Sequence, residues 1–252
     1  MKSPADADSN RTVFKPIKGA YIMIHQHIFA SPKPGMSEED FHRYWIENHA
    51  VNYASKIKQI KRYMIDTRID FAEEKKPPVW NGIAEIWIRE EDQLASLQSE
   101  EFLQGARLDE PKWAAFWNTL VLDTDAEVIV EGPPLAASDS WVKYIVLLKR
   151  KSGMSVNEFR RINRKMQAPL VEKMPGLRRF LICDVRDSWY DLGETRFDGL
   201  VQTWYDNVEA LNAALASPEG HAVKKISSDL FETKYLFTMA VKEHWIIGPE
   251  SR

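Results

Sequence analysis

The chain has 252 residues, of which 44% are hydrophobic and 28% are charged, which is typical of a globular protein with a buried core. Its formal net charge of −3 provides no general attraction for nucleic acid or acidic lipid, because such binding needs an excess of clustered Lys and Arg. We therefore expect neither a nucleic-acid partner nor a membrane partner, and no apolar run approaches the length of a membrane span.

The first eighteen residues, MKSPADADSNRTVFKPIK, lack the apolar segment of a signal peptide. We interpret residues 1–18 as a flexible N-terminal tail. Cys183 is the only cysteine, so a disulfide within the chain and a multi-cysteine metal site are both excluded. These features predict a cytoplasmic protein.

The first predicted unit covers residues 19–131. Residues 21–29 alternate and predict a strand that carries His25 and His27 on one face and aliphatic residues on the other. Ser37 then predicts the start of a helix, with Asp40 as its capping partner. The remaining elements of this unit are expected strands over 62–69, 79–88 and 122–130, a helix over 90–104 and a short helical turn at EPKWAAFW.

The second predicted unit covers residues 140–248 and repeats the first. GMSEEDF at residues 35–41 recurs as GMSVNEF at residues 153–159, and three further matches keep the same order, among them Tyr21 with Tyr144. Its elements are expected strands over 141–149, 177–187, 197–205 and 235–247, with helices that start at Ser155 and Asn207. A short linker, EGPPLAASDS, joins the two units.

Each unit has the order strand, helix, strand, strand, helix, strand, which is the ferredoxin-like βαββαβ pattern of an α+β protein. The helices of such a unit cover one face of its sheet and leave the other face bare. Two units in one chain can cover each other, so we predict an intramolecular dimeric α/β barrel with the helices outside. The mixed face of the first strand, with His25 and His27, is expected to line the interior.

The first predicted helix carries the motif F-x-x-Y-W-x-x-x-H-A, which consists of Phe41, Tyr44, Trp45, His49 and Ala50. With the Gly-Met-Ser turn before it and the GIAEIW strand after it, this stretch resembles the EthD-domain family of the dimeric α/β-barrel superfamily. The resemblance implies a tandem two-copy member that builds, inside one chain, the barrel that single-domain relatives form by dimerising. It also implies cofactor-free tailoring of aromatic molecules, although sister families include heme proteins, monooxygenases and lactone isomerases.

The motif survives only in the first unit, where His49 falls opposite Gln167 and Trp45 falls opposite Asn163. We therefore place the site in the N-terminal half. As a functional residue, His49 would be a general base or acid, because an imidazole with a pKa of about 6.5 exists in both forms near neutral pH. The structural alternative is a core histidine that hydrogen-bonds a backbone carbonyl near the helix end.

The other candidate acid-base residues are His25, His27 and Glu85. The two histidines project from the same face of a strand and can meet a ligand together, but we favour the alternative that they lie solvated at the barrel mouth. Glu85 beside a tryptophan in an enclosed cavity would have a raised pKa and could assist a histidine. Its structural alternative is a salt bridge to Arg62 or Arg68.

The aromatic residues expected to bind the substrate are Tyr44, Trp45, Tyr63 and Trp87. Trp113 and Trp117 are four residues apart and are interpreted as a pair in the core. The sequence contains no HExxH motif and no Gly-rich phosphate loop, so we expect no metal and no cofactor.

These observations predict a cofactor-independent enzyme that acts on a hydrophobic, aromatic or polyketide-like small molecule. His49, assisted by His25, His27 or Glu85, would drive decarboxylation, dehydration or cyclisation by proton transfer, as a lyase or an isomerase does. Two alternatives stay open, namely a cofactor-free monooxygenase that uses O2 and a non-catalytic ligand-binding protein. The pairing of two chains into a homodimer also stays open.

Overall fold

The computed structural model describes residues 22–133, 136 and 140–250. The predicted tail, residues 1–18, lies outside the described residues, as do residues 134–135 and 137–139 of the predicted linker. Within the described ranges, no helix is long and apolar enough to cross a membrane.

The first half contains four strands with helical segments between them. Its main elements are β1 (Met23–Ala30), α1 (Glu38–Tyr44), β2 (Ile60–Ile69), β3 (Gly82–Arg89), α2 (Gln93–Leu97), α3 (Arg107–Asp109) and β4 (Leu120–Val130). Helical turns over Trp45–Ala50 and Glu101–Ala106 extend α1 and connect α2 to α3. The predicted strands and helices of this half are therefore present, with ends shifted by a few residues.

The second half repeats this order. Its main elements are β5 (Val142–Leu148), α4 (Val156–Ile162), α5 (Ala168–Val171), β6 (Arg179–Val185), α6 (Asp187–Tyr190), β7 (Gly199–Tyr205), α7 (Val208–Ala216), α8 (Pro218–Leu230) and β8 (Phe237–Ile247). The helix predicted to start at Asn207 is in fact two helices. Pro218 occupies the first turn of α8 and Ser217 caps it, so one helix ends and another begins there.

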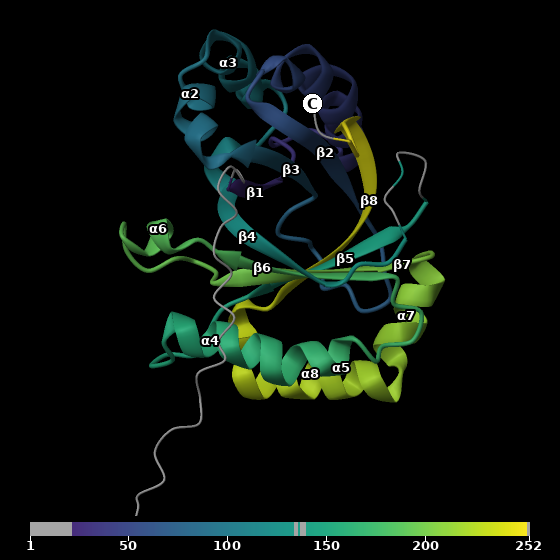
Figure 1. Cartoon of the computed structure of the whole chain (residues 1–252). Helices are drawn as coiled ribbons and strands as arrows, with labels where there is room; N and C mark the ends of the chain where they lie inside the picture. Colours follow the sequence, from purple (N-terminus) through teal and green to yellow (C-terminus); the bar gives the residue numbers. More distant parts are fainter. Residues whose placement is uncertain (1–21, 134–135, 137–139, 251–252) are drawn as a thin grey trace, which may run out of the picture.

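The eight strands form one closed barrel in the order β1-β3-β2-β8-β5-β7-β6-β4. The last strand of each half pairs with both halves: β4 lies between β1 and β6, and β8 lies between β5 and β2. Figure 1 shows the first-half helices α2 and α3 outside one side of the barrel, above the strands, and α4, α5 and α8 outside the opposite side, below them. The predicted α+β fold of two ferredoxin-like units in an intramolecular dimeric α/β barrel is confirmed.

The strand register corrects one part of the repeat. Ala30 of β1 pairs with Gly82, and Leu148 of β5 pairs with the corresponding Gly199. Ala30 therefore corresponds to Leu148, and the match of Tyr21 with Tyr144 was wrong by five residues. A slip by an odd number of residues exchanges the two faces of a strand, but it looks acceptable when both faces are rich in apolar residues.

In the corrected register, the second-half equivalent of His25 is Lys143, and that of His27 is Ile145. All four side chains project from the same face of β1 and β5 into the barrel. This correspondence places a lysine opposite a histidine in the interior.

Both repeats start their first helix in the same way. Gly35 and Gly153 each have a φ of 84°, a left-handed conformation that favours glycine. Two residues later, the hydroxyls of Ser37 and Ser155 accept hydrogen bonds from backbone N–H groups three residues on, at 3.1 Å. The predicted helix starts, including the Ser37 cap with Asp40, are confirmed.

The helix that follows Ser37 packs closely on the outer face of the sheet. A Cβ atom on Gly82 of β3 would come within 2.9 Å of the Trp45 ring and within 2.9 Å of the Asp66 carbonyl oxygen. Glycine at this position therefore lets Trp45 lie directly on the strand. This close approach fixes the helical turn that carries His49.

Trp113 and Trp117 do not form the predicted pair. Trp113 is buried, whereas Trp117 is 65% exposed. The predicted helical turn is broken into two short pieces, Glu110–Lys112 and Phe116–Asn118, so the two tryptophans do not share a helical face.

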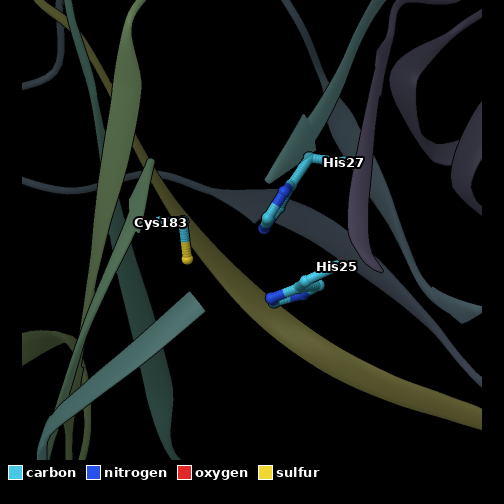
Figure 2. A group of neighbouring side chains, drawn as sticks. All are labelled: His25, His27 and Cys183. Carbon is cyan, nitrogen blue, oxygen red and sulfur yellow. The ribbon is translucent and has the colours of Figure 1, made fainter. Parts of the chain in front are cut away.

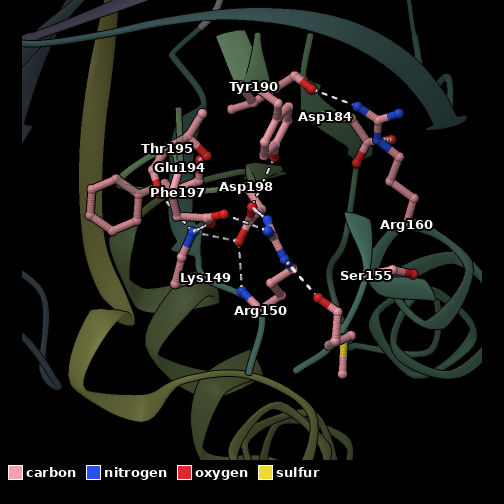
Figure 3. A network of polar contacts seen from close by, with 12 residues as sticks. Lys149, Arg150, Ser155, Arg160, Asp184, Tyr190, Glu194, Thr195, Phe197 and Asp198 are labelled. Carbon is pink, nitrogen blue, oxygen red and sulfur yellow. Dashed lines mark hydrogen bonds and ion pairs between the residues drawn. The ribbon is translucent and has the colours of Figure 1, made fainter. Parts of the chain in front are cut away.

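A polar network in the second half stabilises the loop before β7 (Figure 3). Its centre is the buried Asp198, which accepts hydrogen bonds from the Arg150 backbone N–H at 2.8 Å and the Tyr190 hydroxyl at 2.8 Å. Lys149 and the Arg150 guanidinium form ion pairs with the same carboxylate. Because the side chains that contact Asp198 come from the segment after β5 and from α6, which precedes the loop, we interpret this network as structural.

Candidate functional site

A cavity of about 260 Å³ lies between the first-half helical segments and the outer face of β1, β2 and β3. The sheet contributes aliphatic side chains to its wall, and the helices contribute aromatic ones. Its apolar lining includes Ile28, Ile86, Ile88, Trp45, Phe102 and Trp113. A hollow of this size with a mostly apolar wall is just below the usual range for small-molecule sites, which begins at about 300 Å³.

His49 is the one imidazole that lines this cavity. It lies in the helical turn Trp45–Ala50, one turn after Trp45 and on the same side of the helix. Its ring centroid is 4.8 Å from that of Trp113, and the rings of Trp45 and Trp113 are also 4.8 Å apart. The indoles therefore hold the imidazole against the apolar wall.

A buried carboxylate orients His49. The Nδ1 atom of His49 lies 3.0 Å from Oδ2 of Asp109, a residue that is only 1% exposed. Since an ionised carboxylate can only accept, Nδ1 carries the proton and Nε2 keeps its lone pair. No hydrogen bond ties Nε2 to the part of the chain that the structure describes, so this nitrogen is available to a ligand.

Two further groups hold Asp109 in place. The Tyr44 hydroxyl donates to Oδ1 at 3.0 Å, and the Lys112 ammonium lies 3.0 Å from the same oxygen. Tyr44, which was expected to bind the substrate, thus contacts the Asp109 carboxylate and does not line the cavity.

Burial lowers the pKa of His49 below its usual value, although Asp109 partly opposes this shift through its hydrogen bond and its charge. Burial raises the pKa of Asp109, but the hydrogen bonds from Lys112, His49 and Tyr44 outweigh it and hold the pKa below its usual range. At neutral pH, the pair is therefore a neutral imidazole beside an ionised carboxylate. An imidazole in this state is able to accept a proton from a ligand.

The second half has a different pair at the equivalent positions. Gln167 corresponds to His49 and Ser227 to Asp109, and the Gln167 amide donates to the Ser227 hydroxyl at 2.9 Å. This pair keeps a buried hydrogen bond but has no group that exchanges protons near neutral pH. The duplicated fold thus contains one His-Asp pair at this location and one inert substitute.

His25, His27 and Glu85 lie on the opposite face of the sheet from His49, inside the barrel. His25 is 2% exposed and His27 is 0% exposed, so the interpretation that they are solvated at the barrel mouth was wrong. β1 pairs with β3 on one side and with β4 on the other, so the barrel encloses its inward-facing side chains. The structure does not bring these residues together with His49.

Glu85 forms no salt bridge with Arg62 or Arg68 among the contacts of the described chain. Arg68 instead pairs with Glu38 and Glu74. The Glu85 carboxylate contacts His25 Nε2 at 2.6 Å and the Lys143 ammonium at 2.9 Å. Its partners therefore come from the middle of the barrel. Arg68 lies two residues beyond Asp66 on the same face of β2, next to the end of the strand, and its side chain reaches Glu38 and Glu74 instead.

Lys143 is the centre of this interior network. Its side chain is 0% exposed and lies within 2.9 Å of Asp66, Glu85 and Glu243. Burial lowers the pKa of Lys143, but the three carboxylates outweigh it and raise the pKa overall. Burial raises the pKa of Asp66, whereas for Glu85 the charges of Lys143 and His25 overcome burial and hold the pKa well below its usual value.

The four predicted aromatic residues also divide between the two faces. Trp45 and Tyr63 line the outer cavity. Trp87 faces the barrel interior, where it stacks on His25 with ring centroids 4.3 Å apart and on Trp245 at 5.7 Å. Trp87 is therefore part of the interior network rather than of the His49 cavity.

Sequence reasoning missed Asp109 and Lys143. Asp109 is 60 residues from His49 and belongs to no recognisable motif with it. Lys143 was missed because the alignment of the two halves, which was wrong by five residues in this strand, placed Leu148 at the position equivalent to His25. A repeat aligned through the Gly-Met-Ser turns alone would have placed Lys143 there and Ser227 opposite Asp109.

Comparison with known proteins gives a family match in both halves. Residues 33–116 and residues 151–230 each match the EthD domain, and together they cover more than half of the chain. The first match contains α1 with its motif and the segment up to Trp113, and so includes both His49 and Asp109. No curated protein is significantly similar to the chain in sequence.

Several solved structures share the fold over nearly the whole chain. A protein described as anthrone oxidase-like has a TM-score of 0.61 and 11% identity, over 88% of this chain and 92% of that one. A proposed monooxygenase from Fusobacterium nucleatum has a TM-score of 0.57 and 9% identity, over 93% and 98%. Another from Lactobacillus acidophilus has a TM-score of 0.52 and 14% identity, over 91% and 98%. At these identities the likeness shows the fold alone.

Proposed function

Because the chain belongs to the EthD family, whose domain it contains twice, we propose that it is an enzyme that oxidises a small, electron-rich aromatic molecule with O2 and without a cofactor. The observation that carries this proposal is the His49-Asp109 pair in the wall of an apolar cavity. The names of the structural relatives, which include proposed monooxygenases and an anthrone oxidase-like protein, support the oxygen-using class.

The first step of the proposed reaction is the removal of a proton. A substrate with a CH2 group between aromatic rings lies against Trp45 and Trp113, and the Nε2 lone pair of His49 takes one of its protons. The Asp109 carboxylate stabilises the imidazolium that forms. An apolar wall favours this step because it keeps water from competing for the base and leaves the carbanion reactive.

The second step transfers electrons from the carbanion to O2. A C–O bond forms, and the imidazolium of His49 returns its proton to the new peroxide. Loss of water then leaves a carbonyl, so CH2 and O2 become C=O and H2O. The substrate itself supplies all the electrons, and the protein supplies position and a base.

Anthrone is a suitable probe, because one structural relative is described as anthrone oxidase-like and because the central CH2 of anthrone loses a proton readily. An oxygen electrode should record the uptake of one O2 per anthrone consumed, faster than the spontaneous oxidation in the absence of protein. The quinone product should appear at the same rate.

Deuterium exchange separates this proposal from the non-oxidative reading. If the protein exchanges the CH2 protons with D2O but consumes no O2, the base is active and a decarboxylation, dehydration or cyclisation is favoured instead. If neither exchange nor O2 uptake exceeds the background with any aromatic ligand that the cavity binds, the protein is a binding module.

The pH dependence of the reaction should identify the base. Because the pKa of His49 is lowered from its usual 6.5, kcat/KM is expected to stay constant above pH 6.5 and to fall as the pH drops through the lowered pKa. The charge of Asp109 raises the pKa of His49, so Asp109→Asn should move the acidic fall to still lower pH. The value of kcat/KM on the high-pH plateau should also drop by about 10²-fold, because His49 is then a weaker base and the asparagine amide orients its ring less firmly than the carboxylate does.

The matched control for this variant is Asp229→Asn, at an exposed carboxylate in the helix α8. Its pH profile should overlay that of the natural protein. An Asp109→Asn profile that falls at the same pH as the natural protein would assign the titration to another group.

A further inference from the structure

A cluster of metal-binding side chains lies inside the barrel, separate from the His49 cavity. One ring nitrogen of His25, one of His27 and the sulfur of Cys183 all lie within 4.8 Å of one another. Figure 2 shows the two imidazole rings on one side of the interior and the thiol facing them from the other. The histidines belong to β1 of the first half and the cysteine to β6 of the second half.

Each histidine in this cluster keeps a nitrogen without a hydrogen-bond partner. The Nδ1 atoms of His25 and His27 are buried and have no partner among the described residues. The nitrogens that face the Glu85 carboxylate are the Nε2 atoms, so a cation bound beside this carboxylate would be held by Nε2 of each ring. The rings themselves lie 4.1 Å apart between centroids.

The charged side chains next to the cluster include more carboxylates than ammonium groups. Three buried carboxylates, those of Asp66, Glu85 and Glu243, face the single ammonium of Lys143. Even with Asp66 in the neutral form that burial favours, one ammonium faces the two carboxylates of Glu85 and Glu243, and an additional cation would reduce the excess. The Glu85 carboxylate is the nearest to the cluster, since it lies 2.6 Å from His25 Nε2 and 3.9 Å from His27 Nε2.

We propose that His25, His27 and Cys183, with Glu85 as the fourth ligand, form a zinc site that links the two halves of the barrel. Two imidazoles, one thiolate and one carboxylate are a donor set that suits Zn²⁺ in tetrahedral geometry. A tetrahedral ion would draw the ligand atoms to about 3.4–3.6 Å apart, so the side chains close in by about 1 Å. On binding, the S–H bond of Cys183 breaks, a Zn–S bond forms and the proton is released to solvent.

The role of this metal is structural. It lies on the barrel side of the sheet, whereas the His49 cavity lies on the helix side, so the ion has no contact with the proposed substrate. A bond network from β1 to β6 joins strands of different halves. The metal therefore stabilises the intramolecular barrel. This role is separate from the proposed oxidation chemistry.

The test uses untagged, full-length protein that is unfolded and then refolded with Co²⁺, because the closed barrel limits exchange of the interior. We expect one Co²⁺ per chain, with visible bands of a tetrahedral ion and a thiolate-to-cobalt charge-transfer band in the near ultraviolet. Cys183 is the only cysteine, so this band can come from no other residue. Zn²⁺ should displace Co²⁺ and raise the Tm relative to protein refolded with EDTA.

Two variants and one control complete the experiment. Cys183→Ser and His27→Gln should lose the charge-transfer band and weaken Co²⁺ binding by more than about tenfold, whereas His221→Gln on the exposed side of α8 should retain both. Circular dichroism checks that each variant folds. If the natural protein binds less than a tenth of an equivalent of metal, or binds Co²⁺ without the charge-transfer band, the proposal is overturned whether or not the variants fold.

Discussion

His49→Gln is expected to lower kcat/KM for the oxidation of an anthrone-type substrate by about 10²–10⁴-fold, the range for loss of a general base. Glutamine suits the site sterically, because Gln167 occupies the equivalent position in the second half with a buried hydrogen bond. Its amide can still pair with Asp109 but cannot accept a proton from carbon near neutral pH. The rate of O2 uptake in the oxygen electrode measures the loss.

The matched control is His221→Gln, which makes the same chemical change at an exposed position. It should leave the rate of O2 uptake unchanged. A His49→Gln protein with the natural thermal stability and an undiminished rate would remove His49 from the mechanism and, with it, the outer cavity as the active site.

Lys143→Met is expected to destabilise the fold by about 3–5 kcal/mol, because it removes the one lysine that neutralises a buried group of carboxylates. Asp66, Glu85 and Glu243 then have to bind protons in the folded state, while they stay ionised in the unfolded chain at neutral pH. The unfolded state therefore binds fewer protons than the folded one, and the loss of stability should grow as the pH rises from about 5 to 8.

Urea denaturation at several pH values measures this effect. Lys225→Met is the control, since the Lys225 side chain is 81% exposed and its ion pair with Asp229 lies at the surface. Such a pair contributes at most about 1 kcal/mol. If Lys143→Met unfolds at the same urea concentration as the natural protein across this range, the carboxylates of the interior do not depend on the ammonium for their charge.

The fold follows from the sequence because its strongest signals are local. The Gly-Met-Ser turns, with Gly35 and Gly153 in a left-handed conformation and a serine cap two residues on, occur once in each half and mark the repeat. Strand alternation then defines the inward and outward faces. The one error of register arose in β1 and β5, where apolar residues occupy both faces and a five-residue slip leaves no local conflict.

The site is less predictable, because its partners are distant in sequence. His49 is recognisable from the motif of α1, but the carboxylate that orients it comes from Asp109, beyond two further strands and a helical segment. The barrel network is harder still, since Lys143 and Cys183 reach His25 and Glu85 from the other half of the chain. No pattern within one half reveals a contact between halves.

The separation of the two polar groups by a single sheet explains how one duplicated fold can carry both. Odd-numbered residues of β1, including His25 and His27, project into the barrel. Even-numbered ones, including Gln26 and Ile28, line the outer cavity. A substitution on the inward face of β1 therefore does not alter the residues that line the outer cavity, and the reverse is also true.

A crystal structure of the protein with a bound aromatic ligand, such as the quinone product of anthrone, tests the central claim most directly. We expect the ligand in the outer cavity, against Trp45 and Trp113, with its oxygen or reactive carbon facing Nε2 of His49. A ligand found inside the barrel beside His25 and Trp87, or at the second-half position beside Gln167, would contradict the assignment of the active site to the His49-Asp109 pair.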